Sequence, residues 1–187
     1  MQKIIQSFFW GIFAAGFALI AEILLQTFLG IIFSPAYFST VFTHFSFSIF
    51  LFVLIEEISK YIIISKKILL YSKEKSALLN TFIAGAGFSF VELTFIYNFS
   101  PLEFFTTQIL IQIAILHIAT FGIIAYYSIP NKITLKPVLF TFFIHSLYNL
   151  IVLLGEKTFP LAIPLLLAII ILLNIWNLFT AKHKLAS

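Results

Sequence analysis

The chain contains no cysteine, no aspartate and no arginine, and only 10% of its 187 residues are charged. Without cysteine, the protein can form neither a disulfide nor a thiol nucleophile. Without aspartate, it cannot build the aspartyl dyad of acid proteases. The sequence also lacks an H-E-x-x-H zinc helix and a G-x-S-x-G nucleophile turn. These absences exclude several common designs of hydrolytic enzymes.

Apolar residues make up most of what remains. The chain is 61% hydrophobic and 18% aromatic, with a mean hydropathy of +1.12. A soluble domain of this size could not bury so much apolar surface, so a lipid bilayer must form part of its surroundings. The net charge is +4, but the lysines are spread over several loops. Nucleic acid is therefore not an expected partner.

Six long apolar segments follow one another, each with about the 20 residues that a membrane-spanning helix needs. No internal repeat and no long linker divides the sequence. The prediction is an all-α, polytopic integral membrane helix bundle that forms a single transmembrane domain over residues 1–187. The predicted spans are 4–33, 41–66, 76–98, 103–128, 135–154 and 160–180.

Lysine placement predicts the orientation of this bundle. Nearly all lysines fall on one side of the predicted spans, and the opposite loops hold only Lys157, which has Glu156 beside it. Because basic residues are retained in the cytoplasm, both termini are expected there. The first apolar segment is too long for the core of a signal peptide, so it is expected to remain as a helix. The lysines on the basic side are Lys3, Lys66, Lys67, Lys73, Lys75, Lys132, Lys136, Lys182 and Lys184.

Ionisable side chains interrupt the apolar segments at a few positions. Glu56, Glu57 and Lys60 lie close together in the second segment, in a chain with only seven acids. A charged group in hydrocarbon costs several kcal/mol, so such residues usually line a site or a pathway. The other candidates inside apolar segments are Glu92, His117 and His145.

Counting along the helices places three of these groups at one depth. Glu56 lies ten residues before Lys66, His117 ten before Tyr127 and His145 ten after Leu135. Each distance from the cytoplasmic end is therefore about 15 Å at 1.5 Å per residue. That is the middle of a hydrocarbon core about 30 Å thick. Glu92 lies 17 residues after Lys75, so it is expected somewhat higher unless its helix is tilted or begins late.

Spacing within the predicted helices indicates two pairs of polar residues that share a helix face, and one small-residue surface for helix packing. Glu56 and Lys60 are four residues apart, as are His145 and Asn149, so each pair projects from one helix face. The run Ala-Gly-Ala-Gly at 84–87 is expected to let the third helix approach a neighbour closely.

This set of groups suits hydrolysis of a peptide bond. A carboxylate in a protein-lined cavity can act as a general base on water. An imidazole can orient that water or protonate a leaving amine. A His–Asn pair can donate hydrogen bonds to the oxyanion that forms when water attacks a carbonyl, a role whose loss typically costs about 3 kcal/mol.

The order of these groups resembles a known protease family. The motifs and their order match the PrsW-type proteases, which belong with the CAAX prenyl-protease and bacteriocin-processing (Abi) superfamily of intramembrane glutamic-type peptidases. The resemblance covers roughly residues 50–150. The motifs that carry it are Glu56-Glu57-x-x-Lys60, Phe88-x-x-x-Glu92, His117 and His145-x-x-x-Asn149.

This resemblance implies a glutamate-activated water. Glu56 would activate the water, and Glu57 and Lys60 would hold or tune it, although the residues themselves leave open which of the two glutamates is the base. The CAAX branch usually has His where Glu92 stands and Arg near the position of Lys60. The chain differs there in the manner of the PrsW branch, so a prenylated substrate is not implied.

The remaining roles and the partners also come from the resemblance. His145 and Asn149 would form the oxyanion site, while Glu92 and His117 would orient water or substrate. The expected function is an intramembrane endopeptidase acting on a membrane-associated protein, with an anti-sigma factor as the example that PrsW-like proteins suggest. The expected location is the cytoplasmic membrane of a prokaryote.

Metal binding is the main alternative for the same residues. Two histidines and two or three glutamates could hold zinc and leave a position open for water, and PrsW-like proteins have at times been described as metal-dependent. Because no helix carries a ligand pair of the zincin type, the expectation is a site that requires no cofactor. The alternative zinc ligands are Glu57, Glu92, His117 and His145.

Other interpretations remain open beside these. Glu56, Glu57 and Lys60 could form a structural ion pair, but two carboxylates and one lysine would leave an uncompensated acid at depth. A non-catalytic scaffold related to the gamma-secretase Aph subunit is one alternative function. A proton-coupled transporter that uses the Glu/His groups as a relay is another.

Four further polar residues have simpler interpretations. Glu22 and Gln26 share a face of the first segment and lie toward its outer end by the residue count. Interhelical hydrogen bonding is the expected role of both, with substrate contact as the alternative. His44 and His183 are interpreted as residues at the membrane interface.

Overall fold

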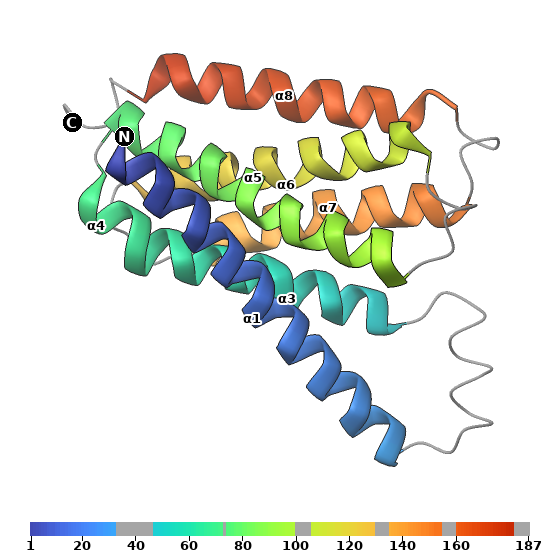
Figure 1. Cartoon of the computed structure of the whole chain (residues 1–187). Coiled ribbons are helices and arrows are strands. Elements are labelled where there is room, and N and C mark those ends of the chain that lie inside the picture. Colours follow the sequence, from blue (N-terminus) through green and yellow to red (C-terminus); the bar gives the residue numbers. More distant parts are fainter. Residues whose placement is uncertain (33–46, 73, 100–105, 130–134, 155–159, 182–187) are drawn as a thin grey trace.

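The computed structural model describes residues 1–32, 47–72, 74–99, 106–129, 135–154 and 160–181 (Figure 1). Every regular element in these ranges is a helix, in agreement with the all-α prediction. In chain order they are α1 (Gln2–Ile32), α3 (Phe47–Ile63), the π-helix η1 (Ile64–Ile68), α4 (Leu69–Tyr71), α5 (Glu74–Phe99), α6 (Thr107–Ser128), α7 (Lys136–Leu154) and α8 (Ala162–Thr180).

Five of these helices are long and apolar enough to cross a membrane. They are α1, α5, α6, α7 and α8, and their ends lie within a few residues of the predicted segments. The predicted span 41–66 corresponds to α3, which has 17 residues, including three charged ones, and continues directly into η1 and α4. Residues 41–46 lie outside the described part. The long apolar helices indicate an integral membrane protein.

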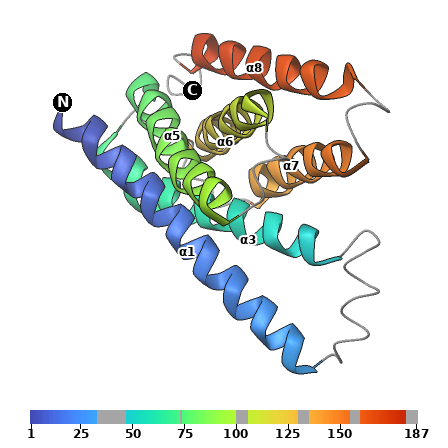
Figure 2. The same ribbon diagram turned by 45° about the vertical axis from the view of Figure 1, so that its right-hand side comes forward.

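Helix α6 occupies the centre of the bundle. It packs against α5, α7 and α8 and also touches α3, and Figure 2 shows it among the first three of these helices. Thr106 begins this helix by accepting a hydrogen bond from the backbone N–H of Ile109 at 3.3 Å, as a helix cap does. Helix α1 runs obliquely across α3 and α5 in both ribbon views (Figures 1 and 2).

Glycines bring α5 close to both of its neighbours. A Cβ atom at Gly85 would lie 2.6 Å from the Cα atom of Ile118 on α6, and one at Gly87 would overlap the carbonyl oxygen of Phe8 on α1. Only hydrogen fits at these positions, as small residues commonly allow between membrane helices. The small-residue run at 84–87 therefore packs as predicted, and it holds α5 between α1 and α6.

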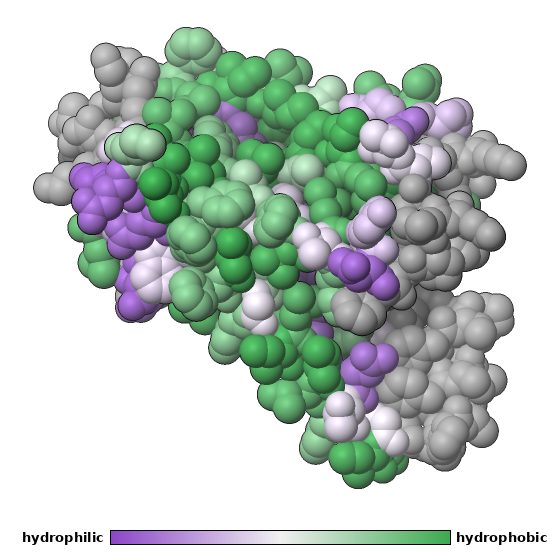
Figure 3. Space-filling model, in the orientation of Figure 1, coloured by the Kyte–Doolittle hydropathy of each residue, from purple (hydrophilic) through white to green (hydrophobic). Residues whose placement is uncertain are grey.

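Large apolar side chains cover the outside of the bundle. Phe179 is 71% exposed, Trp176 is 66% exposed and Phe17 is 58% exposed. The space-filling view shows a largely hydrophobic face, with hydrophilic residues gathered at the end where the N-terminus and α4 lie and near the opposite end (Figure 3). This is the pattern of a protein whose outer face contacts lipid.

The start of α1 and the end of α8 lie at the same end of the bundle (Figure 1). Ser7 and the Tyr71 hydroxyl, at the end of α4, are hydrogen-bonded at 2.8 Å. At the same end, the Tyr126 hydroxyl of α6 and Thr180 of α8 are hydrogen-bonded at 2.9 Å. When α3 is included, consecutive helices run in alternating directions through the bundle, in the order α1, α3, α5, α6, α7 and α8 (Figure 1).

Candidate active site within the helix bundle

A buried ion pair on α3 forms the centre of the site. Lys60 donates a hydrogen bond from Nζ to Glu57 Oε1 at 2.6 Å, and neither side chain is exposed. Lys60 also donates to Thr120 Oγ1 of α6 at 3.2 Å, and its Nζ lies 5.0 Å from the centre of the Phe88 ring on α5. One lysine thus connects three helices.

The Glu57 carboxylate is shared with α7. His145 Nδ1 lies 2.9 Å from Glu57 Oε1, and His145 is only 3% exposed. The tautomer that carries its proton on Nδ1 would donate this proton to the carboxylate. In this tautomer, Lys60 and His145 both donate to the same oxygen of Glu57, so this side chain has little freedom to move.

Glu56 has a different environment from its neighbour. Its Oε2 lies 3.6 Å from His145 Nδ1 and 4.0 Å from His117 Nδ1, and its side chain is 15% exposed. These distances exceed a direct hydrogen bond but are short enough for a single water to bind both partners. The carboxylate and both imidazoles therefore meet, as the depth count predicted.

Glu92 and His117 form a second pair, between α5 and α6. Glu92 Oε2 contacts His117 Nε2. The His117 ring stacks on Phe88 with its centre 4.8 Å away and lies edge-on to His145 with the centres 5.1 Å apart. Glu92 thus lies level with the cluster rather than above it. The residue count alone places it higher, because such a count takes no account of helix tilt.

Two cavities border the site, and Asn149 lines the larger one. This cavity has a volume of about 340 Å³ and has both Asn149 and Glu56 in its wall. A smaller cavity of about 150 Å³ also borders Glu56 and includes Glu92 and Phe88. The larger cavity is lined by Glu22, Ile49, Phe52, Val53, Glu56, Asn149, Val152 and Leu153.

Comparisons with protein families, with curated proteins and with solved structures find no match for this chain. The chemistry of the site is therefore interpreted from its own residues. The ion pair and both imidazoles form one connected buried cluster. Glu56 borders both cavities, and Glu92, which contacts His117, borders the smaller one.

The same cluster includes a group of donors that could hold a metal ion. Glu56, His117 and His145 each offer an atom within 4.8 Å of those of the other two. Two of these three are among the alternative zinc ligands that the sequence predicts. Glu57 and Glu92 are not in this group: Glu57 is bound to Lys60 and His145, and Glu92 contacts His117 through Nε2.

Sequence reasoning missed one residue of the site and assigned another a lesser role. Thr120, a partner of Lys60, was not a candidate, although it follows His117 by three residues and so shares its helix face. Glu22 was expected to form interhelical hydrogen bonds, but it lines both cavities. The depth count placed it too far outward because α1 is oblique (Figure 2). His44 and His183 lie outside the described residues.

Proposed function

We propose that the protein is an intramembrane endopeptidase in which Glu56 activates water, as the resemblance to PrsW-type proteases implies. The observation that carries this proposal is the difference between the two adjacent glutamates. Glu57 is fully buried and bound to Lys60 and His145. Glu56 borders both cavities and lies within reach of one water molecule from both imidazoles. Glu56 is therefore the better general base.

Each residue of the site has a separate role in the proposed reaction. Glu56 takes a proton from water as the water oxygen attacks the carbonyl carbon of the scissile bond. Asn149 donates a hydrogen bond to the oxyanion that forms, and His145, when both of its ring nitrogens are protonated, donates a second one from Nε2–H. His117, held by Glu92, helps to orient the water. It then takes the proton from Glu56 and passes it to the amine nitrogen as the carbon–nitrogen bond breaks, which leaves Glu56 ionised again. Lys60 keeps Glu57 in place, so that His145 keeps its orientation.

The membrane arrangement is part of the same proposal. Helix α3, together with η1 and α4, would form a sixth span, and both termini would face the cytoplasm because the lysines gather at that end. The substrate would be a membrane-associated protein in the cytoplasmic membrane of a prokaryote. An anti-sigma factor is the example that the resemblance suggests.

The decisive experiment compares wild type with Glu56→Gln. Candidate membrane substrates are incubated with each purified protein in lipid nanodiscs, and the new N-termini are mapped by mass spectrometry. We expect Glu56→Gln to lower kcat at least about 100-fold, because general bases contribute roughly that much or more. Glu103→Gln, which alters an acid that lies outside the described residues and is not a candidate site residue, is the matched control and should cut like wild type. Equal cutting at the same bond by Glu56→Gln would refute the proposal and favour a scaffold.

A zinc-dependent peptidase is the second candidate, favoured by the grouping of Glu56, His117 and His145. Zinc bonds to nitrogen and oxygen are about 2.0–2.2 Å long. The ligand atoms of the three side chains would therefore have to move about 1 Å closer to one another. Bound zinc would polarise the carbonyl and lower the pKa of its water. Metal analysis of the purified protein separates the two candidates. About one zinc per chain, lost in His117→Ala, would support this second candidate, whereas a metal-free protein that is active in a strong chelator would support the first.

A further inference from the structure

Glu22 is the acid of the site for which neither the fold nor the proposed mechanism gives a partner. In the described part of the chain, no hydrogen bond or ion pair engages its carboxylate. It projects from α1 and lines both cavities together with Glu56. A carboxylate at this depth that serves no structural purpose suggests that its partner arrives with a ligand.

The two cavities are built from different helices. Apart from Glu22 and Glu56, the smaller cavity is bounded by α1 and α5, and the larger one by α3 and α7. Glu22 and Glu56 therefore lie where the two cavities meet. The remaining wall of the smaller cavity consists of Ala15, Ala18, Leu19, Phe88, Glu92, Phe95 and Ile96.

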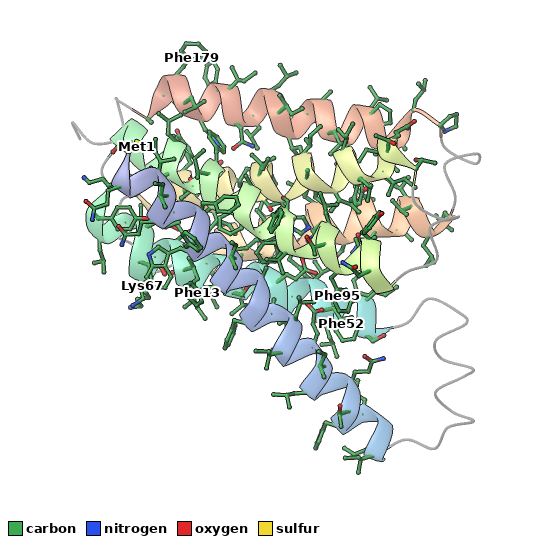
Figure 4. The ribbon with its side chains drawn as sticks, viewed as in Figure 1. Met1, Phe13, Phe52, Lys67, Phe95 and Phe179 are labelled. Atoms are coloured by element: carbon green, nitrogen blue, oxygen red, sulfur yellow. The ribbon has the colours of Figure 1, made fainter. Side chains whose placement is uncertain are left out.

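Both cavities are large enough and apolar enough to accept side chains. Their volumes are about 150 Å³ and about 340 Å³, whereas one water takes up about 30 Å³ of liquid. Phe52 of α3 belongs to the larger cavity and Phe95 of α5 to the smaller one, and both are labelled in Figure 4. Each cavity thus has at least one aromatic residue in its wall.

The walls also indicate the direction of approach. Ile49 and Phe52 precede Glu56 on α3, and Leu153 follows His145 on α7. The larger cavity therefore extends from Glu56 away from the lysine-rich helix ends. On this side α1 diverges from the bundle in both ribbon views (Figures 1 and 2).

We propose, on the basis of the proposed peptidase function, that the two cavities are the subsites for residues on opposite sides of the cleaved bond. Glu22 is then a substrate-contacting residue where the subsites meet, and it accepts a hydrogen bond from an N–H group of the substrate. An extended peptide crossing Glu56 would place one side chain in each cavity. Its backbone amide, or a basic side chain beside the cut, would supply the N–H group.

A matched pair of truncations tests the two subsites. Phe52→Ala and Phe95→Ala are compared on a synthetic library in which a lysine-flanked apolar helix carries randomised residues around the cut. Each variant should raise kcat/KM for bulky aromatic residues about fivefold or more on one side of the bond, and less than about twofold on the other. The two variants should act on opposite sides. Phe95 is 41% exposed, so its truncation should leave folding intact. A second pair of variants tests the same two cavities: Ile49→Ala for the larger one and Ile96→Ala for the smaller one.

Glu22 is tested by removing and restoring its acceptor oxygen. Glu22→Met should raise KM about tenfold with little change in kcat, as loss of one charge-assisted hydrogen bond predicts. Glu22→Gln keeps an acceptor and should recover most of the loss, while Gln26→Ala, on an exposed position of the same helix, should match wild type. Peptides with norleucine for lysine, and peptides with an N-methylated backbone, identify which N–H group is bound.

The possible outcomes distinguish a failure of the subsite assignment from a failure of the peptidase proposal. If wild type cleaves, Glu56→Gln does not, and both phenylalanine variants shift the same side or neither side, the subsite assignment is wrong and the peptidase proposal stands. If Glu22→Met behaves as wild type, Glu22 has no contact with substrate. If wild type cleaves none of the library, while a scaffold activity survives in Glu56→Gln, the peptidase proposal fails and this inference fails with it.

Discussion

At the scale of single residues, the protein places two adjacent glutamates in two different environments. Consecutive residues of a helix point about 100° apart, so Glu57 faces Lys60 and His145 while Glu56 faces the cavities. The sequence predicts both residues as candidates but cannot rank them, because the ranking depends on which face of α3 meets α7. That packing is visible only in the folded structure.

The ion pair predicts a strongly non-additive effect on stability. Lys60→Met would leave the Glu57 carboxylate buried with His145 as its only donor, and we expect a loss of about 3 kcal/mol in the free energy of unfolding. Glu57→Gln should cost a similar amount, because it leaves the buried Lys60 ammonium without its carboxylate, although the amide oxygen can still accept a hydrogen bond from Lys60. The double variant should cost less than the sum of the two, with a coupling of about 2 kcal/mol. Unfolding of the three variants in detergent, followed by circular dichroism, measures these differences.

A substitution of an exposed lysine provides the control for these three variants. Lys67→Met removes a lysine that is exposed at the end of the bundle, where its Nζ lies 5.0 Å from the centre of the Trp10 ring. Its cost should stay below about 1 kcal/mol, the usual range for an exposed cation–π contact. Additive losses for Lys60→Met and Glu57→Gln would show that the two side chains do not depend on each other.

At the scale of helices, the close contact of α5 with α1 predicts the effect of a single methyl group. Gly87→Ala would push a Cβ atom into the carbonyl oxygen of Phe8, and we expect a loss of about 1–3 kcal/mol. Gly16→Ala is the matched control because nothing lies within 4 Å of its added Cβ. Alanine there should be neutral or stabilising by up to about 1 kcal/mol, as helix propensity predicts. Thermal unfolding of both variants tests this contrast, and equal melting temperatures would contradict the close packing.

The helices themselves were largely predictable from the sequence. Long apolar runs allow no other structure in a bilayer, and the five spanning-length helices follow them closely. The π-helix η1, at Ile64–Ile68, was not predicted because apolar periodicity does not distinguish a π turn from an α turn. The level of Glu22 and Glu92 was also missed, because a residue count measures distance along an axis whose tilt is set by packing.

At the scale of the whole molecule, the convergence of Glu56, His117 and His145 could be predicted because helical rise is nearly constant. Three helices that each have one end near the same membrane surface bring residues at equal counts from that end to equal depth. Which groups touch within that layer depends on helix rotation, which the sequence does not specify. The cavities that give Glu22 its importance depend on the same rotations.

Whether α3 crosses the membrane decides the topology of the whole chain, and the absence of cysteine makes this directly measurable. A single introduced cysteine would be the only thiol in the protein. Gln2→Cys, Ser76→Cys and Leu161→Cys place it at exposed positions near the starts of α1, α5 and α8. If α3 spans the bilayer, an even number of crossings separates the first two positions, so they share a side.

The lysines at that end predict that this side is the cytoplasm. A membrane-impermeant maleimide should therefore label Leu161→Cys in intact cells, and should label Gln2→Cys and Ser76→Cys only after the membrane is opened. The cysteine-free chain is the blank. Labelling of Gln2→Cys and Ser76→Cys from opposite sides would mean that α3 does not cross. Glu56 would then lie near a membrane surface instead of at the middle of the bilayer, and water would reach it without the cavities.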